Sequence, residues 1–376
     1  MFCRAVLFAF SAWTCAAEVR AGRFQDRDAW VIETAAVRVS ITQSGGHIAE
    51  IVLKETGVNP LWVQKRPTID PDTYDPARHE KSYGGGPGAR LMSGIVGHNV
   101  CFPFWGNPSD TEFRAGMTYH GETGIVRWKQ LAASGDSLTI AAELPESRTR
   151  FTRTVRAAGQ VVYFESTGEN LSGWDRPVGW CEHATLGPPF LEKAATLIDA
   201  SLTRGRAIGD ESGLEFLWPT GEDSGARIDL RTVRDIPRSG FVNNFLVDPA
   251  REYGWFAATH PRLRLVFGYV FRRVHFPWLN IWEANNPEML TRGMEFSNTP
   301  THGTLKALMK AKPLFGTPLY DWLDARSKLD KRFAVFGARV PEGFRGVAEV
   351  RPAGAKLEIV ERETGRATTL DFDPRF

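Results

Sequence analysis

Four short stretches of this sequence combine acid–base side chains with aromatic rings. They are Gly94–Gly106 (GIVGHNVCFPFWG), Met117–Trp128 (MTYHGETGIVRW), Pro177–Leu191 (PVGWCEHATLGPPFL) and Phe276–Pro300 (FPWLNIWEANNPEMLTRGMEFSNTP). Apolar ring faces stack on sugar rings, while His, Asn, Arg and Glu side chains bind hydroxyl groups, so the combination indicates a site for a neutral sugar. An opposed histidine and glutamate could transfer protons there without a metal ion or a cofactor.

Each of these residues also has a simpler explanation when it is taken alone. Glu182 and His183 are adjacent, so on a strand they point to opposite faces, and only one of them can line a given cleft. A strand histidine such as His120 is more often a surface or hydrogen-bonded core residue. Trp278 and Trp282 are also suited to the core of a β-sandwich. The functional hypothesis therefore depends on the residues as a set.

The order of the motifs resembles the aldose 1-epimerase or galactose mutarotase-like superfamily. GHNVCFPFWG, YHGETGIVRW, EHATLGPPF and RGMEFSNTP follow one another, and the similarity is spread from about Trp30 to Pro300. The resemblance implies a large antiparallel β-supersandwich with the sugar site on a concave sheet face. It implies that the chain interconverts the anomers of a hexose or a related sugar.

The resemblance assigns the two catalytic roles to His183 and Glu295. His183 matches the general acid that protonates the ring oxygen, and Glu295 matches the base that removes the proton of the anomeric hydroxyl. Thr185 stands where the family has an aromatic residue, two positions after the histidine. Asp248 is a candidate for the family's aspartate.

Five other side chains are predicted to contact the sugar. His120 matches the substrate-binding histidine of the His-Gly motif, and Arg90 matches the arginine upstream of that motif. His98 stands near the place of a missing arginine-asparagine-arginine signature. Trp282 and Glu283 complete the set, and Glu283 is also the alternative base.

The residues leave other functions open. A sandwich of this kind could bind a sugar without transforming it. A sugar-phosphate epimerase would need cationic groups at the anomeric site, for which Arg90, Arg114 and Arg127 are candidates. A hydrolase built on two carboxylates could use Glu283 and Glu295.

A zinc site is a further alternative. His98 and Cys101 in the first motif, with Cys181 and His183 in the third, could in principle supply two nitrogen and two sulfur ligands. The two pairs are eighty positions apart, and the predicted function needs no metal.

The composition bounds the fold and the partners. The 376 residues include 36 Gly, 23 Pro, 24 Phe and 12 Trp, a mixture typical of a mostly β protein. With 46 basic and 44 acidic residues, the chain has no large net charge to attract nucleic acid or an anionic membrane. A small-molecule sugar is the predicted partner.

The hydrophobic pattern predicts mostly strands. Alternation around Val37–Ile41, a Gly-Gly turn and a run at Ile48–Leu53 indicate a hairpin. Further strands are predicted at Ser137–Glu143, Arg148–Ala157, Gln160–Asn170, Ala195–Ser201, Ala226–Leu230, Tyr253–Thr259, Arg262–Phe271 and Leu357–Glu361. Gln64–Arg90 is predicted to be a long loop, and Leu319–Phe333 the single short helix. We therefore expect one antiparallel β-sandwich domain over residues 25–376.

The N-terminus resembles a secretory signal peptide over residues 1–17. Arg4 precedes an apolar run and a group of small residues, with cleavage expected after Ala17. The mature protein would then be periplasmic or secreted, and otherwise cytoplasmic. The cysteines left after cleavage, Cys101 and Cys181, could pair or could serve as small buried hydrophobes.

Overall fold

Antiparallel strands make up most of the regular structure in the computed structural model, as the predicted all-β class requires. The model describes residues 17–208, 213–235, 238–300 and 303–376. The predicted signal peptide, apart from Ala17, lies outside the described residues.

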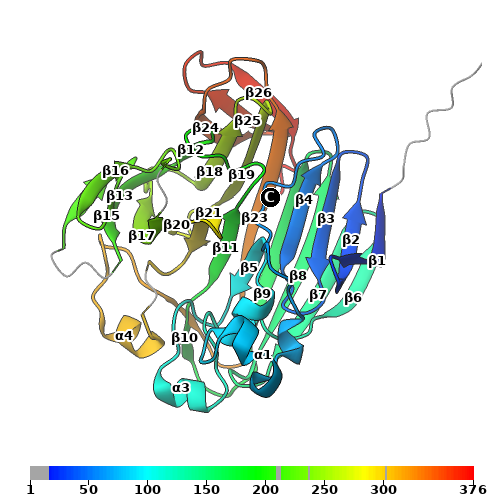
Figure 1. Cartoon of the computed structure of the whole chain (residues 1–376), viewed down its shortest axis with the longest axis vertical. Coiled ribbons are helices and arrows are strands. Elements are labelled where there is room, and N and C mark those ends of the chain that lie inside the picture. The colour runs from blue at the N-terminus through cyan, green and yellow to red at the C-terminus, as the bar shows by residue number, and fades with distance from the viewer. Residues whose placement is uncertain (1–16, 209–212, 236–237, 301–302) are drawn as a thin grey trace, which may run out of the picture.

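The largest sheet has eleven strands and contains strands from the first, third and fourth motifs (Figure 1). In spatial order its strands are β1 (Glu18–Phe24), β2 (Arg27–Glu33), β3 (Val37–Thr42), β4 (Ile48–Leu53), β5 (His98–Cys101), β11 (Cys181–Leu186), β21 (Leu290–Ser297), β20 (Trp278–Asn285), β17 (Arg238–Val247), β13 (Leu202–Ala207) and β14 (Glu215–Leu217). Strands far apart in the sequence therefore meet at the centre of this sheet.

A second sheet of eight strands packs against the first. Its strands are β12 (Leu197–Ala200), β18 (Tyr253–His260), β19 (Leu265–Arg272), β23 (Lys328–Arg339), β9 (Val161–Asn170), β8 (Thr149–Ala158), β7 (Ser137–Leu144) and β6 (Lys129–Ser134). Along β8, Phe151, Arg153 and Val155 are buried while the residues between them are partly exposed. This alternation explains why one face of the sheet forms the main core with the first sheet.

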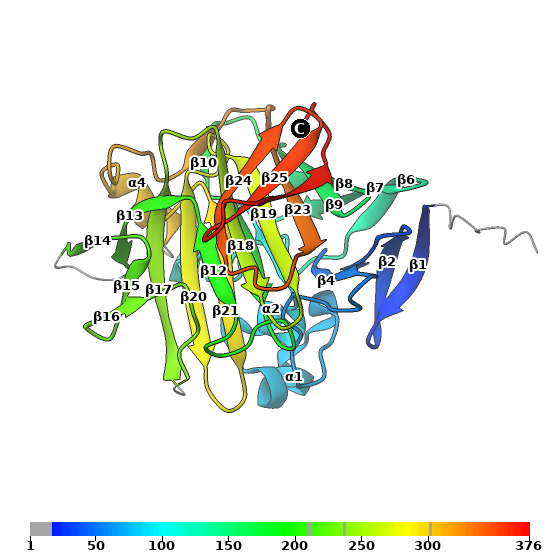
Figure 2. The same ribbon diagram turned by 90° about the horizontal axis from the view of Figure 1, so that it is seen from above.

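A third layer covers part of the other face of the eight-stranded sheet. It consists of β24 (Val347–Ala353), β25 (Lys356–Glu361) and β26 (Ala367–Asp371), which bury a separate apolar cluster against β18, β19 and β23 (Figure 2). Two short pairs complete the strands: β10 (Arg176–Val178) with β22 (Asp321–Leu323), and β15 (Thr220–Asp223) with β16 (Ala226–Asp229).

The predicted hairpin and the eight other predicted strand runs are confirmed. In the hairpin, β3 and β4 are joined through Gly45 and Gly46, both at positive φ. A Cβ atom on Gly46 would lie 2.5 Å from the indole of Trp128. Only glycine therefore lets the second motif pack on this turn.

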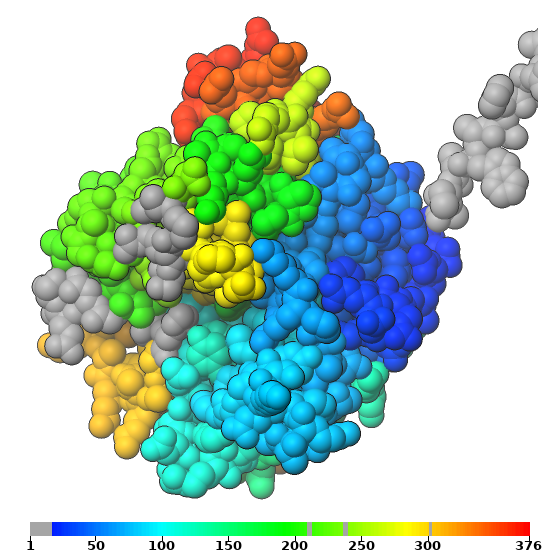
Figure 3. Space-filling view, in the orientation of Figure 1, coloured from blue at the N-terminus to red at the C-terminus, as the bar shows by residue number. Residues whose placement is uncertain are grey.

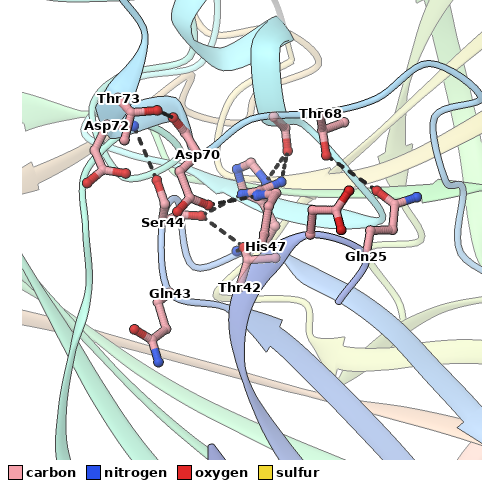
Figure 4. Close-up of polar contacts among 12 residues, drawn as sticks. Gln25, Thr42, Gln43, Ser44, His47, Thr68, Asp70, Asp72 and Thr73 are labelled. Carbon is pink, nitrogen blue, oxygen red and sulfur yellow. Dashed lines mark hydrogen bonds and ion pairs between the residues drawn. The ribbon is translucent and has the colours of Figure 1, made fainter. Parts of the chain in front are cut away.

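The predicted loop Gln64–Arg90 is partly helical. It contains the 3-10 turn η1 (Pro71–Thr73) and helix α1 (Pro76–Tyr83), and helix α2 (Ala89–Gly94) starts within it. Asp72 donates its backbone N–H to Ser44 Oγ, which ties the turn to the hairpin loop (Figure 4). The other helices are α3 (Asp110–Arg114) and α4 (Leu305–Lys310). Among the described residues, no helix is long and apolar enough to cross a bilayer.

The predicted helix at Leu319–Phe333 is wrong. This segment forms β22, a turn, and the first half of β23. Trp322, in β22, is 54% exposed. β23 pairs with β9 on one side and β19 on the other, so long-range strand pairing overrides the local helical spacing.

A buried charge network holds β11 against the second sheet. Glu182 is fully buried between the sheets and accepts hydrogen bonds from Arg153, from Trp180 Nε1 at 2.9 Å and from His98 Nε2 at 2.9 Å. Burial raises the pKa of Glu182, but the charge of Arg153 and the contact with His98 bring it below its ordinary value. Burial lowers the pKa of His98. The carboxylate therefore pairs mainly with the guanidinium.

Replacing Arg153 with methionine should strongly destabilise the fold. The change leaves the Glu182 carboxylate buried without its cation, which costs about 3–5 kcal/mol of the free energy of unfolding. The matched control is Arg150→Met, because Arg150 lies on the partly exposed face of the same strand and pairs with Glu143 and Glu169. That variant should lose at most about 1 kcal/mol. Urea denaturation measures both, and equal losses would contradict the importance of the network.

Candidate active site

The strand register brings His183 and Glu295 together. His183 on β11 is directly opposite Glu295 on β21, with Asn99 of β5 on one side and Asn280 of β20 on the other. These four residues form a row across the sheet, here called the His183 row. Their side chains point away from the main core, whereas the neighbouring Glu182 points into it, as predicted from strand alternation.

The imidazole and the carboxylate are in contact. His183 Nε2 lies 2.7 Å from Glu295 Oε1, and both side chains are buried. Neither oxygen of Glu295 has a well-aligned hydrogen-bond partner in the described part of the chain, so this contact is a close approach rather than a directed hydrogen bond. Thr185 Oγ1 lies 3.4 Å from His183 Nδ1 at the other side of the ring. The carboxylate thus keeps the capacity to accept protons from a ligand.

A cavity of about 620 Å³ opens beside this pair. Its walls include His120, His183, Trp282 and Glu295, together with Tyr119. The volume lies within the usual range for small-molecule sites, about 300–1,000 Å³. The cavity therefore joins an acid–base pair to aromatic surfaces.

Trp282 owes its position to a glycine. It lies opposite Gly293 on β21, where a Cβ atom would be 1.7 Å from the indole Nε1. The indole consequently lies over Gly293, with its ring centre 5.9 Å from that of His183. Its Nε1 is buried and has no hydrogen-bond partner among the described residues. A flat apolar surface is thus fixed next to the imidazole.

His120 also lines the cavity. It adopts a φ of 66°, and the Gly106 N–H donates to its Nδ1 at 3.0 Å. Its ring centre lies 5.3 Å from that of His183. The next residue must be glycine, because a Cβ atom on Gly121 would be 2.3 Å from the carbonyl oxygen of Phe102. The His-Gly pair therefore turns the chain so that the imidazole faces the cavity.

His47 contacts both the end of α2 and the loop that carries His120. Its Nδ1 lies 3.0 Å from the carbonyl oxygen of Gly94, and its Nε2 lies 3.0 Å from that of Gly124. Arg27 donates to the same Gly94 oxygen and to Ser44. These buried contacts connect α2, the hairpin turn and the second motif.

His98 and Glu283 lie on the core side of the sheet, which corrects their predicted contact with substrate. His98 is fully buried, bonded to Glu182 and packed against Tyr269. Glu283 is bonded to the buried Arg292. His98 is adjacent to Asn99, and Glu283 is adjacent to Trp282. Because side chains alternate along a strand, His98 and Glu283 point to the core when their neighbours point to the cavity side.

The cationic residues predicted from the sequence also lie outside the cavity wall. Arg90 donates weakly to the carbonyl oxygen of Pro71, and burial lowers its pKa. Arg127 pairs with Asp70 and Asp72, and Arg114 is exposed at the end of α3. Asp248, the candidate for the family's aspartate, pairs with Arg251 on the surface.

The alternative metal and hydrolase sites do not assemble. His98 faces the core, whereas Cys101, Cys181 and His183 face the other side. Cys101 and Cys181 are opposite each other on β5 and β11 as free, buried thiols. Within the described ranges, no cluster of three or more His, Cys, Asp or Glu could hold a metal ion. Glu283 and Glu295 point to opposite faces and cannot act on one bond.

Sequence reasoning missed several residues of the site. Asn280 and Asn99 flank His183 and Glu295, and each has a buried amide oxygen without a hydrogen-bond partner among the described residues. The amino group of Asn280 donates a hydrogen bond to Ser297 Oγ at 3.0 Å. Trp62, just before the predicted loop, is a third. Asn99 and Asn280 lie inside the first and fourth motifs, but only the register of β5, β20 and β21 places the two amides in the row.

Comparison with known proteins identifies the fold. No protein-family model matches the sequence, and no curated protein sequence matches it either. Solved structures do match. A candidate aldose 1-epimerase from Klebsiella pneumoniae is 14% identical with a TM-score of 0.62, covering 85% of this chain and 82% of that one. The chain has the galactose mutarotase-like fold.

Two further structures agree with this assignment. A galactose mutarotase-like protein from Clostridium acetobutylicum is 11% identical with a TM-score of 0.60, covering 86% of this chain and 99% of that one. A galactose mutarotase related enzyme from Lactobacillus acidophilus is 12% identical with a TM-score of 0.56, covering 84% and 99%. At such identities the likeness establishes the fold, and the chemistry must be argued from the residues.

Gly293→Ala should displace Trp282 and open the wall of the cavity. The new methyl group cannot coexist with the indole, so the ring must rotate away or the two strands must separate. We expect a changed near-UV circular dichroism spectrum and a loss of about 1–3 kcal/mol in the free energy of unfolding. Gly173→Ala is the control, because nothing lies within 4 Å of its Cβ position. An unchanged spectrum for Gly293→Ala would refute this packing.

Proposed function

We propose that this chain is an aldose 1-epimerase that interconverts the anomers of a neutral sugar. The observation that carries the proposal is the 2.7 Å approach of His183 Nε2 to Glu295 Oε1 at the wall of a sugar-sized cavity. Two opposed proton-transfer groups are what ring opening and closure of a sugar require. The fold shared with the structures above supports the same activity.

The proposed mechanism uses the two groups in turn. Glu295 takes the proton from the anomeric O1 as His183, in its protonated form, gives a proton to the ring oxygen O5. The C1–O5 bond breaks and the C1–O1 bond becomes a carbonyl. Rotation about C1–C2 presents the other face of the aldehyde to O5. Ring closure returns both protons with the roles reversed, so the atoms and charges balance without a cofactor.

The remaining cavity residues bind and orient the sugar in this proposal. Trp282 supplies a stacking surface in the cavity wall. His120 supplies a further polar contact beside His183. The three arginines predicted to bind a phosphate do not line the cavity, although Lys65 and Arg66 do.

Conservative changes of the two catalytic residues test the activity. Polarimetry follows the mutarotation of α-D-glucose and α-D-galactose above the spontaneous rate. His183→Asn and Glu295→Gln should each lower kcat by about 10²–10⁴-fold, because each removes one proton transfer. His79→Asn on α1 and Glu363→Gln in the β25–β26 turn are matched controls that should keep wild-type rates.

Two results would contradict the proposal. Full activity in both catalytic variants would mean that other groups transfer the protons. Sugar binding by the wild-type protein with no acceleration above the spontaneous rate would identify a carbohydrate-binding module instead.

We also propose that the protein is exported. β1 begins at Glu18, so cleavage after Ala17 would leave every described strand intact. N-terminal sequencing of the mature protein from its native host should begin at Glu18. An intact Met1 in the cytoplasmic fraction would contradict export.

A further inference from the structure

Cys101 and Cys181 are a matched pair of thiols that the proposed reaction does not use. They are direct partners in the register of β5 and β11, and Cys181 lies two residues before His183, on the same face of the sheet. Opposed residues of an antiparallel pair have Cα atoms about 4.5–5.5 Å apart, and a disulfide needs about 4.4–6.8 Å. The backbone spacing therefore allows the two sulfur atoms to bond.

The hydrogen bonds along the two strands show which kind of pair the cysteines form. The Thr185 N–H donates to the carbonyl oxygen of Gly97, opposite it, at 3.1 Å. The Gly179 N–H donates to the carbonyl oxygen of Pro103 at 2.7 Å. Hydrogen-bonded pairs recur at every second position of an antiparallel ladder, so the cysteines between these two pairs also form a hydrogen-bonded pair.

A disulfide at a hydrogen-bonded pair is strained. Opposed Cβ atoms are about 4.5–5.5 Å apart, with hydrogen-bonded pairs at the upper end, whereas a disulfide holds them about 3.5–4.5 Å apart. The bond must therefore draw the two Cβ atoms together by roughly 1 Å. Strain makes a disulfide easier to reduce, and strained disulfides are the labile ones. The geometry favours a bond that forms and breaks with the redox conditions over a permanent cross-link.

Both thiols are enclosed in the folded protein. They are fully buried and pack with Trp105, while Ile208 lies partly buried against them. Farther along the same face, at the edge of the cavity, Lys65 Nζ donates to the carbonyl oxygen of Pro287 at 3.3 Å. This contact joins the segment after β4 to the β20–β21 turn, and the two lie side by side in Figure 3. The face of β11 that carries the thiols is thus covered by other segments of the chain.

Burial also limits the reactivity of the thiols in the folded state. It raises the pKa of Cys101, and it raises the pKa of Cys181 well above its ordinary value. The thiolate is the species that attacks a disulfide, and little of it is present at such a pKa. Oxidation therefore takes place while the chain folds, or when the cover over β11 opens.

The cysteine pair is connected to the His183 row through Asn99. The amino group of Asn99 donates a hydrogen bond to Cys101 Sγ at 3.6 Å. Asn99 is also the direct neighbour of His183 across β5 and β11, and its amide oxygen has no hydrogen-bond partner among the described residues. Movement of the Cys101 sulfur towards Cys181 lengthens its contact with Asn99 and releases the amide. The oxidation state of the pair can thus reach the imidazole through one side chain.

We infer that Cys101 and Cys181 form a reversible disulfide, and that its formation displaces the Asn99 amide beside His183. The oxidant is a small-molecule disulfide such as oxidised glutathione. The thiolate of one cysteine attacks it, forms a mixed disulfide and releases one small thiolate. The thiolate of the other cysteine then displaces the second. The protons of the two cysteines pass to the two released thiolates, and two electrons move from the protein to the oxidant.

The first measurement asks whether the bond forms. The full chain with Cys3→Ser and Cys15→Ser retains only the two thiols of this pair. It is refolded from urea with oxidised or with reduced glutathione. The oxidised sample should lose both thiols in a titration under denaturing conditions, and peptide mapping should show Cys101 linked to Cys181. Dithiothreitol should restore both thiols.

The second measurement asks whether the bond affects the site. NMR follows the ring protons of His183, which are assigned by their absence in His183→Asn. Their chemical shifts should differ between the oxidised and the reduced protein, whatever the activity. Polarimetry should show a kcat lower by about 10–10²-fold in the oxidised protein, because a displacement of about 1 Å near a catalytic group is costly. This effect on kcat rests on the proposed function.

Cys181→Ala is the control for both measurements. It cannot form the bond but keeps the contact between Asn99 and Cys101, so oxidised and reduced glutathione should give the same His183 shifts and the same kcat. Cys181→Ser takes its place if the alanine variant does not fold.

Three results would overturn the inference. They are free thiols or separate glutathione adducts after oxidising refolding, a bond that dithiothreitol does not reverse, and identical His183 shifts in the oxidised and reduced protein. Failure of the proposed function has a different signature. A formed bond and shifted His183 resonances, with no mutarotation by the reduced protein, would refute the epimerase activity alone.

Discussion

The pairing of Glu182 with Arg153 is the interaction on which the site depends. A fully buried carboxylate is stable only with a compensating cation and hydrogen bonds, and Arg153 of the second sheet supplies the cation. This contact fixes the side of β11 that faces inward. Because side chains alternate along a strand, it also fixes His183 on the opposite face. A slip of one residue would bury the imidazole and expose the carboxylate.

The pairing of distant strands then assembles the rest of the cavity. β11 lies between β5 and β21, so His183 becomes the neighbour of Asn99, 84 positions before it, and of Glu295, 112 positions after it. Glycines at the contact points allow the close approach: Gly293 accommodates Trp282, and Gly187 accommodates the backbone of Trp62. The long segment between β4 and β5, much of which was predicted to be a loop, forms one wall of the cavity. Its helices and the Arg27 contacts hold that wall in place.

Local patterns in the sequence predicted the strands well. A strand with one face on the core alternates between apolar and polar residues, and this alternation is visible in the sequence. They failed at residues 319–333, where leucine spacing favoured a helix but pairing with β9 and β19 selected a strand. For the site, the order of the motifs was enough to select His183, Glu295, His120 and Trp282. It could not predict which face of the sheet His98 points to. That face depends on the register of β5 against β11, which is set by tertiary structure. The amides of the His183 row were missed for the same reason.

The side chains of His183 and Glu295 contact each other directly in the cavity wall. A ligand that binds either group must therefore replace a contact within the protein and not only solvent. Both side chains are buried, so the partner released from this contact has to find a new hydrogen bond in the ligand. Without that new bond, a buried polar group would be left unpaired, which is costly.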